Sequence, residues 1–506
     1  MNKIRHYIKK NIIFSICVVI IIASNTTISA SNISTNKTNK LNYVLAENDD
    51  IEWFDGNFKA SWINIKENSV GKIWGDINLG RTSSDGEFQA EWNNSDGSFG
   101  TIRGRFKNSI ITGIVKTNDK IIPNFFFGKL TFNETKFTAF IYAFKTGVFY
   151  IDGEYESSFL PPLTGPYGVG LKSMHLIDES RPESFTPDDP EDFREMMVQI
   201  FYPIDKEIKE SRVEYMDGPT FAWLKDRSPV PLVTISDDAY TFVRPHGKNE
   251  TPISKDQQNY PVIIFSPGYD GVYQIYTSLI EDIVSNGFIV AAINHPYVSG
   301  ITVFPDGRKV YLAENSSGDL GLRSVVEDAK FVLDTITELN SSDPDLQGCF
   351  DLSKVGMYGH SFGGASTSIC LYEDNRFLCG LTLDGVFYLD YIPEGLNKPF
   401  LLMIAENRFN DENVQQMWDS LNGDSYKVEV LGSTHYAYTD VGVLLNHMVP
   451  LIPNRILGFG TIEPKRHVNI TRIFELAFFE VYLKGLPVQD LVNLGSAFND
   501  VIFDYK

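Results

Sequence analysis

Residues 354–370 read KVGMYGHSFGGASTSIC, and this stretch decides the fold. Its first residues are typical of a short buried strand, and the apolar run at its end predicts a helix. Between them lies the pattern G-x-S-x-G with Ser361 at its centre. A strand that turns this sharply into a helix holds its apex residue in a strained conformation, and Gly359 and Gly363 leave room for the backbones to close. We therefore expect Ser361 to be exposed at a helix N-terminus, as a candidate nucleophile.

The length and the N-terminal composition predict several separate segments. The chain has 506 residues, more than one core usually needs, so we expect two domains. Basic residues precede an uncharged apolar run from Ile12 to Ala23, and small residues follow up to Ala30. Residues 1–30 are therefore predicted to be a secretory signal peptide, with an uncleaved membrane anchor as the alternative. The polar residues 31–40 are typical of a disordered spacer, and the chain is predicted to be secreted or extracytoplasmic.

Charge and cysteine usage exclude some classes of function. The formal net charge of −21 argues against nucleic acid and anionic membranes as partners, and it leaves neutral or zwitterionic substrates open. Three cysteines follow the apolar segment: Cys349, Cys370 and Cys379. Their number fits either one disulfide, most simply Cys370 with Cys379, or three small buried thiols. No Cys/His cluster has the spacing of a zinc site, so we expect no metal and no cofactor.

Residues 41–160 have the composition of an all-β domain. Short runs rich in aromatic and β-branched residues alternate with Gly, Asn and Asp turns. Strands at intervals of roughly ten residues predict a sheet, a barrel or a sandwich. Either a ligand-binding face or a packed core fits the four tryptophans Trp53, Trp62, Trp74 and Trp92. The stretch PPLTGP at residues 161–166 breaks the pattern and marks the start of a second domain, residues 161–506.

The second domain is predicted to alternate strand and helix. It opens on two antiparallel strands around a charged loop, residues 164–178 and 195–205, and residues 206–256 give no clear element. Further strands are predicted at residues 260–268, 288–296, 379–385, 398–406 and 426–432, and helices at residues 276–287, 318–339, 414–421 and 468–483. Such alternation builds a mostly parallel sheet with helices on both faces and active groups at the carboxyl ends of the strands. This is the layout of an α/β-hydrolase.

Two partners for Ser361 follow it in the chain order that this fold requires. Asp384 ends the strand after the nucleophile, and His435 comes just past the last predicted parallel strand. His435 Nε2 would take the proton of Ser361, while Asp384 would accept a hydrogen bond from His435 Nδ1 and stabilise the imidazolium. Of the other acids, Asp390 lies beyond the turn and Asp440 lies five residues past His435. Of the other histidines, His360 is adjacent to Ser361 and would point away from it, and His295 at its strand end is interpreted as structural. His447 and His467 lie in later segments.

A negatively charged intermediate needs two N–H donors. The first is expected from the backbone of Phe362, the residue after the nucleophile. The second is expected from the loop after the strand that begins at residue 260. Pro267 has no N–H, so Tyr269 is the better donor, and Gly268 gives its backbone room.

Several stretches of residues 164–485 share their order and spacing with one known family. They are TGPYGVG, MHLIDESR, MVQIFYP, VIIFSPG, NGFIVAAINHP, GHSFGGAS, LTLDG, STHYAYTD and ITRIFELAFFEVYLKG. In these stretches the chain resembles the platelet-activating factor acetylhydrolase family. The resemblance implies a metal-independent serine esterase that removes short or oxidised acyl chains from phospholipids, with Ser361, Asp384 and His435 as the triad. The family carries His where this chain has Pro267, and the β-rich region lies outside the resemblance.

The leading hypothesis is a secreted carboxylic ester hydrolase that works through a covalent acyl-enzyme. One alternative is an esterase for small or polymeric esters, or a peptidase, because a fold does not fix its substrate. Another is a cell-surface binding protein in which the β domain carries the function and the hydrolase domain is vestigial. Residues 441–460 are apolar and are interrupted by Pro450 and Pro453. They fit a lid, a surface that touches lipid, or a buried connection.

Overall fold

The computed structural model describes residues 55–64, 69–79, 85–94, 99–107, 110–117, 124–133, 136–143, 147–157, 160–206, 208, 210–227, 243–448 and 454–506. The predicted signal peptide or anchor, residues 1–30, and the predicted spacer, residues 31–40, lie outside them. Within the described residues, every helix is too short or too polar to cross a membrane.

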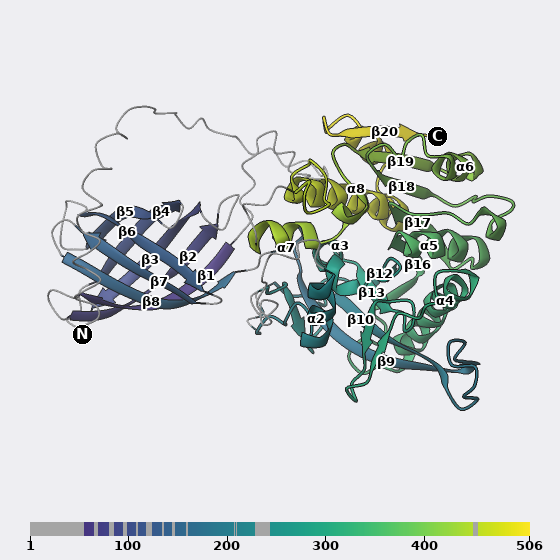
Figure 1. The fold of residues 1–506 in the computed structure, drawn as a ribbon, viewed down its shortest axis with the longest axis horizontal. Coiled ribbons are helices and arrows are strands. Elements are labelled where there is room, and N and C mark those ends of the chain that lie inside the picture. Colours follow the sequence, from purple (N-terminus) through teal and green to yellow (C-terminus); the bar gives the residue numbers. More distant parts are fainter. Residues whose placement is uncertain are drawn as a thin grey trace. The chain divides into compact units, whose positions relative to one another are not determined.

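The first eight described strands form a closed antiparallel barrel (Figure 1). Each strand pairs with the next along the chain, and the first pairs with the eighth, which closes the sheet. Of the three all-β arrangements that the sequence allows, this region therefore adopts the barrel. The strands are β1 Asp55–Asn64, β2 Ser69–Leu79, β3 Asp85–Asn94, β4 Phe99–Lys107, β5 Ile110–Thr117, β6 Asn124–Asn133, β7 Lys136–Ala143 and β8 Gly147–Ser157.

One barrel tryptophan has a visible packing role. Trp92 on β3 lies opposite Gly100 on β4. A Cβ atom on Gly100 would lie 2.9 Å from Trp92 Nε1, so the glycine makes space for the indole. The same Nε1 donates a hydrogen bond to the Lys116 carbonyl at 3.4 Å. Trp53 lies outside the described residues, and the side chains of Trp62 and Trp74 lie outside the described part of the structure, so the prediction for these three stays open.

The second sheet has ten strands in the order β11-β9-β10-β13-β12-β16-β17-β18-β19-β20. The six strands from β13 to β19 in this order run parallel, and β9, β10 and β20 add antiparallel pairings at the two edges. The bounds are β9 Gly168–Pro182, β10 Phe193–Ile204, β11 Gly247–Asn249, β12 Tyr260–Ser266, β13 Ile289–Asn294, β16 Phe350–His360, β17 Phe377–Leu383, β18 Phe400–Ala405, β19 Ser425–Val430 and β20 Val501–Tyr505. A separate hairpin consists of β14 Ile301–Val303 and β15 Lys309–Tyr311.

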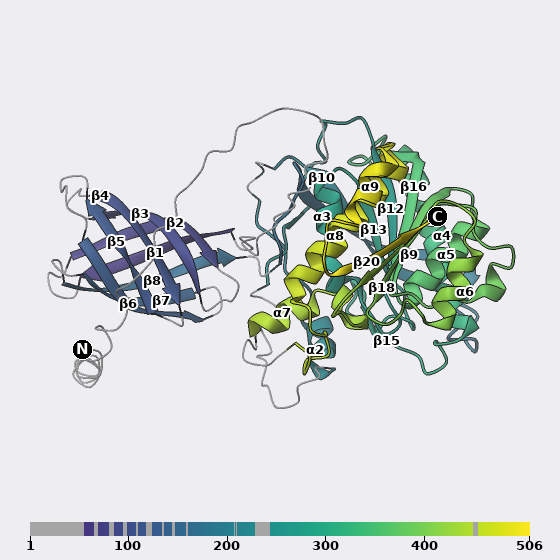
Figure 2. The ribbon, with the colours of Figure 1, turned by 90° about the horizontal axis from the view of Figure 1, so that it is seen from above.

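Helices cover both faces of this sheet (Figures 1 and 2). Helices α3 and α8 pack together on one face, and α4 and α5 pack together on the other. Strands β12 and β18 are buried along their whole length, as expected for parallel strands between two helical layers. The helices are α2 Gly218–Asp226, α3 Thr277–Ser285, α4 Asp319–Ser342, α5 Phe362–Glu373, α6 Glu412–Ser420, α7 Val441–Met448, α8 Pro464–Lys484 and α9 Val488–Leu494. Short 3₁₀ turns are η2 Tyr273–Tyr276, η3 Leu389–Tyr391 and η4 His435–Tyr438.

The structure adds a helix where the sequence gives no clear element, and it decides between the two alternatives for the cysteines. Residues 206–256, where the sequence is polar and gives no clear element, contain α2, which Asp217 caps by accepting a hydrogen bond from Thr220 N. The three cysteines are free and buried, so the disulfide alternative does not hold in this structure.

Candidate active site

Ser361 occupies the sharp turn between β16 and α5. Its backbone angles are φ 54° and ψ −114°, a strained conformation for a residue with a side chain. A Cβ atom on Gly359 would lie 2.4 Å from the Gly363 carbonyl carbon, and one on Gly363 would lie 2.1 Å from the Ser266 carbonyl oxygen. Only glycine fits both positions, so these residues allow the turn that presents Ser361.

Asp384 and His435 come from the carboxyl ends of β17 and β19, the two strands that flank β18 in the sheet. Asp384 follows β17 and is buried, whereas His435 opens the turn η4 after β19 with 35% of its side chain exposed. The two side chains are joined between Asp384 Oδ2 and His435 Nδ1 at 2.6 Å. Burial alone would raise the pKa of Asp384, but hydrogen bonds from His435 and from Ala405 N, with the nearby charge of Arg408, lower it below its ordinary value. The carboxylate is therefore well placed to orient an imidazole.

The elbow and the histidine loop are in direct contact. His360, the residue before Ser361, forms a hydrogen bond from Nε2 to the His435 carbonyl at 2.9 Å, and the two imidazole rings lie 4.5 Å apart. Among the described residues, no hydrogen bond joins Ser361 Oγ to His435 Nε2. Such bonds are often long in the absence of substrate and tighten in the complex.

Two backbone N–H groups beside Ser361 have no acceptor among the described residues. They belong to Phe362, the first residue of α5, and to Tyr269. The loop that carries Tyr269 passes close to the elbow, since a Cβ atom on Gly268 would lie 3.3 Å from Ser361 Cβ. Both predicted oxyanion donors are therefore free to bind an incoming oxygen atom.

The competing acids lie elsewhere. Asp390 is exposed in η3. Asp440 is buried and accepts hydrogen bonds from Ser278 and Tyr215. Burial raises the pKa of Asp440 to about 7, although these hydrogen bonds oppose the rise. Neither carboxyl group forms a hydrogen bond with a described histidine.

The competing histidines that the structure describes also lie away from Ser361 or have other partners. His295 lies between Ser266 Oγ, 2.9 Å from its Nε2, and Asp328 Oδ2, 2.9 Å from its Nδ1. This arrangement has the connectivity of a second triad, but all three side chains are buried and Arg194 already pairs with Asp328. It holds the end of β12 rather than a substrate. His467 is buried in α8, and the side chain of His447 lies outside the described residues.

Arg408 is a further residue beside this pair, and no sequence motif singles it out. Its Nη1 lies 3.4 Å from Asp384 Oδ2, and its Nη2 donates to the Gly385 carbonyl at 3.2 Å. It follows Asn407, which has a φ of 69°, in the turn after β18. The polar run after the predicted strand 398–406 was the available signal, because neighbouring parallel strands end at the same edge of the sheet.

Replacement of Arg408 with Gln is expected to shift the pH dependence of activity. A cation beside the Asp384–His435 pair opposes protonation of the pair, so its loss raises the pKa of Asp384 toward the ordinary value. The acid limb of the kcat/KM profile should then move to higher pH, and the shift should be small because solvent partly screens the charge of Arg408. Arg408→Lys keeps the charge and should keep the wild-type limb. Identical limbs in wild type and Arg408→Gln would contradict this role.

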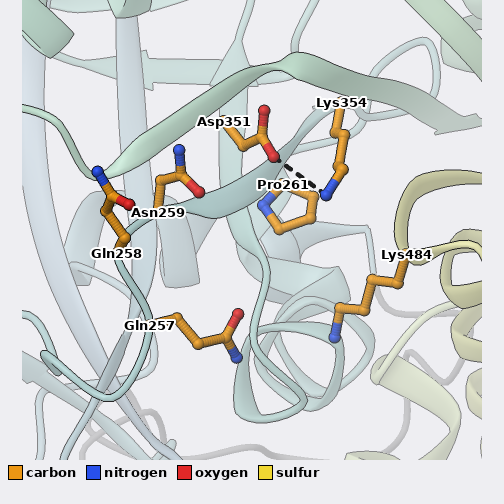
Figure 3. Close-up of a pocket in the computed structure, with 7 residues that line it drawn as sticks. All are labelled: Gln257, Gln258, Asn259, Pro261, Asp351, Lys354 and Lys484. Carbon is orange, nitrogen blue, oxygen red and sulfur yellow. Dashed lines mark ion pairs between the residues drawn. The ribbon is translucent and has the colours of Figure 1, made fainter.

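A polar pocket of about 360 Å³ lies at the opposite edge of the sheet (Figure 3). Pro261 and Asp351 lie near the amino ends of β12 and β16, whereas Ser361 follows the carboxyl end of β16. The pocket is lined by Gln257, Gln258, Asn259, Pro261, Asp351, Lys354 and Lys484. Because parallel strands place their two ends on opposite edges, this pocket is separate from the Ser361 site.

Comparisons with known proteins agree with this architecture. The sequence profile described as "Platelet-activating factor acetylhydrolase, isoform II" matches residues 153–337 and 334–490. A probable 1-alkyl-2-acetylglycerophosphocholine esterase of Arthroderma benhamiae is 24% identical over 69% of this chain and 94% of its own length. The platelet-activating factor acetylhydrolase of Canis lupus familiaris is 26% identical over 65% of this chain and 78% of its own length.

A solved structure shares the fold of the second sheet. The ferulic acid esterase of Streptomyces cinnamoneus is 29% identical, with a TM-score of 0.58, over 68% of this chain and 98% of its own chain. The fold and the relatives together define this protein as a carboxylic ester hydrolase of the α/β-hydrolase fold. Because the profile match extends over most of the chain, the protein belongs to the platelet-activating factor acetylhydrolase isoform II family.

Proposed function

We propose that the protein is a secreted serine esterase that removes short acyl chains, such as acetyl, or oxidised acyl chains from phospholipids. The observation that carries this proposal is the hydrogen bond between Asp384 and His435 beside the strained Ser361 turn. The relatives named for 1-alkyl-2-acetylglycerophosphocholine hydrolysis and for platelet-activating factor acetylhydrolysis supply the substrate class.

The first half of the proposed reaction forms an acyl-enzyme. Ser361 Oγ attacks the ester carbonyl carbon while His435 Nε2 removes the hydroxyl proton, and Asp384 stabilises the imidazolium. The carbonyl oxygen becomes negative and accepts hydrogen bonds from the backbones of Phe362 and Tyr269. The intermediate then collapses, the C–O bond to the glycerol breaks, and His435 gives its proton to the departing lysophospholipid oxygen.

The second half regenerates the enzyme. Water replaces the lysophospholipid, His435 removes its proton, and the hydroxide oxygen attacks the acyl carbon. The bond to Ser361 Oγ breaks as His435 returns the proton to it, which releases the free acid.

The substrate is tested by comparing three esters at equal concentration. We expect 1-alkyl-2-acetylglycerophosphocholine to be cleaved with a much higher kcat/KM than its 2-palmitoyl counterpart. Methyl ferulate is the third substrate, because the similar solved structure is a ferulic acid esterase. Turnover of methyl ferulate without hydrolysis of either phospholipid would keep the esterase and discard the phospholipid substrate.

We also propose that residues 1–30 direct secretion and that residues 41–160 and 161–506 are separate domains. The basic and apolar composition before Ala30 supports the first. The end of β8 at Ser157 and the start of β9 at Gly168 support the second. N-terminal sequencing of protein recovered outside the cell should give a chain that begins near Ser31. A cell-bound protein with an intact N-terminus would contradict secretion.

We further propose that the site faces a lipid surface through two exposed apolar side chains. Tyr436 directly follows His435 and is 63% exposed, and Ile456 is 67% exposed. The loop of Ile456 is tied to the histidine loop by a hydrogen bond from Thr434 Oγ1 to the Gly458 carbonyl at 2.6 Å. The other described apolar residues of segment 441–460 are mostly buried, which favours a packed connection with one exposed tip.

Loss of these two side chains is expected to weaken binding to zwitterionic vesicles. Tyr436→Ser with Ile456→Ser should reduce sedimentation with phosphatidylcholine vesicles by roughly tenfold or more, because each buried apolar side chain contributes about 1.5–3 kcal/mol. Ile177, 51% exposed on β9, supplies the control variant Ile177→Ser. Equal vesicle binding by the double variant and the control would exclude this surface.

A further inference from the structure

His360 is a buried histidine that the proposed reaction does not use. It precedes Ser361 and is 3% exposed. Both of its ring nitrogens are nevertheless within hydrogen-bond distance of a partner. Nδ1 lies 2.9 Å from Tyr276 Oη, and Nε2 lies 2.9 Å from the His435 carbonyl oxygen.

These partners fix the direction of each hydrogen bond in the series that runs through His360. A carbonyl oxygen can only accept, so His360 Nε2 carries the proton and donates to His435. The neutral ring then has a lone pair on Nδ1, which accepts from the hydroxyl of Tyr276. The oxygen of Tyr276 in turn accepts from the backbone N–H of Gly268 at 3.4 Å. The bonds therefore run one way, from Gly268 through Tyr276 and His360 to His435.

This series of hydrogen bonds requires a neutral His360 ring, and the surroundings of the ring favour the neutral form. Burial, together with the neighbouring His435, lowers the pKa of His360 to about 3, although the Asp384 charge opposes the shift. A protonated ring would present an N–H to the Tyr276 hydroxyl and reverse that bond. Tyr276 is itself buried, and burial keeps its hydroxyl protonated by raising its pKa.

These hydrogen bonds connect three parts of the site that must act together: the loop of Tyr269, the nucleophile turn and the loop of His435. Gly268 precedes Tyr269, which supplies one oxyanion N–H, and His435 is the base. The packing between them is tight, since a Cβ atom on Gly268 would lie 3.0 Å from His360 Nδ1. The ring of Tyr276 also packs against Phe265, with ring centroids 4.9 Å apart. A shift of one part is therefore passed to the others.

We propose that Tyr276 and His360 are positioning residues that lock the oxyanion loop and the base loop to the nucleophile turn. This inference rests on the proposed roles of Ser361, His435 and Tyr269. Reacting groups must be held within a few tenths of an ångström, and a misplacement of about 1 Å can cost about 100-fold in rate. A purely structural role would instead give two satisfied buried polar groups with no special effect on the reaction.

Tyr276→Phe in the full chain separates these two roles. The substitution removes one hydroxyl and leaves the ring in place, so the Gly268 N–H and His360 Nδ1 lose their partner. With p-nitrophenyl acetate we expect kcat to fall by about 10- to 100-fold while KM changes by less than about threefold. The inhibition constant of a trifluoromethyl ketone, which mimics the charged intermediate, should rise in proportion to the loss in kcat/KM.

Tyr202→Phe is the matched control. Tyr202 on β10 is also buried, and its hydroxyl donates to the Thr251 carbonyl at 2.8 Å. Loss of this hydroxyl should lower the melting temperature about as much as Tyr276→Phe does, because each variant removes one buried hydrogen-bonding group. Its kcat and its inhibition constant should remain those of the wild type.

A double-mutant cycle gives a second reading. His360→Gln retains an amide donor toward His435 but lacks the imidazole acceptor for Tyr276. If the two residues act through one series of hydrogen bonds, the double variant should have a kcat less than about threefold below that of His360→Gln alone. Multiplication of the two separate losses would overturn the proposal.

The outcomes also separate this inference from the proposed function. A wild-type protein that cleaves no ester contradicts the proposed function itself. An active wild type with Tyr276→Phe indistinguishable from Tyr202→Phe in kcat and inhibition overturns the positioning role alone. If Tyr276→Phe does not fold, His360→Gln in the same assays decides, with wild-type kcat counting against the proposal.

Discussion

Replacement of Ser361 with Ala is expected to lower kcat for short-chain esters by at least about 10⁴-fold. The reason is that the proposed acyl-enzyme cannot form without the Oγ atom. Some activity over the uncatalysed reaction should remain, because the N–H groups of Phe362 and Tyr269 can still stabilise an oxyanion when water attacks directly. Acetate release from 1-alkyl-2-acetylglycerophosphocholine, followed over long incubation, measures both the loss and the remainder.

Ser368→Ala is the control for Ser361→Ala. Ser368 lies on the same helix, α5, and its hydroxyl donates only to the Ala365 carbonyl within that helix. This variant should keep the wild-type kcat. Retention of more than a tenth of the wild-type rate by Ser361→Ala would remove Ser361 from the reaction.

Replacement of Asp384 with Asn is expected to lower kcat by about 10³- to 10⁴-fold with little change in KM. The amide can still accept the hydrogen bond from Ala405 N that Asp384 Oδ1 accepts at 2.9 Å. It carries no charge to stabilise the imidazolium, and its NH₂ group can hold His435 in the wrong tautomer. Steady-state kinetics at several pH values measure the loss.

Asp390→Asn is the control for the acid. Asp390 is exposed in η3 and is the nearest alternative in sequence, so its replacement should leave kcat unchanged. The reverse pattern, with Asp390→Asn inactive and Asp384→Asn active, would assign the acid to Asp390.

The parallel core of the second domain could be predicted from the sequence because its signals are local. The strands β12, β13 and β18 are nearly continuous apolar runs, and the helices α3 and α4 have clear 3.6-residue periodicity. Chain order then placed Ser361, Asp384 and His435 at one edge of the sheet. The hydrogen bond between Asp384 and His435 follows from that placement.

The edge elements were harder to predict because they are short. The strand β20 has five residues and forms an antiparallel pair with β19, a contact with no local signature. The hairpin of β14 and β15 has three residues in each strand. Closure of the barrel likewise depends on pairing β1 with β8, the two strands farthest apart in this region.

The supporting contacts of the site depend on backbone geometry that sequence patterns do not carry. Arg408 reaches Asp384 because Asn407 adopts a positive φ of 69°. Tyr276 reaches His360 because η2 follows the loop of Gly268 and Tyr269, which passes close to the turn at Ser361. The sequence predicts which groups react, whereas the structure gives the contacts that hold them.

The most direct test of the account is to trap the acyl-enzyme. The protein is mixed with 1-alkyl-2-acetylglycerophosphocholine, quenched in acid within the first turnovers, digested and analysed by mass spectrometry, with Ser361→Ala treated in parallel. We expect one acetyl group on the peptide that contains Ser361 in the wild type and none in the variant. Acetate release by the wild type with an acetyl group on another residue, or with the same adduct in Ser361→Ala, would contradict the account.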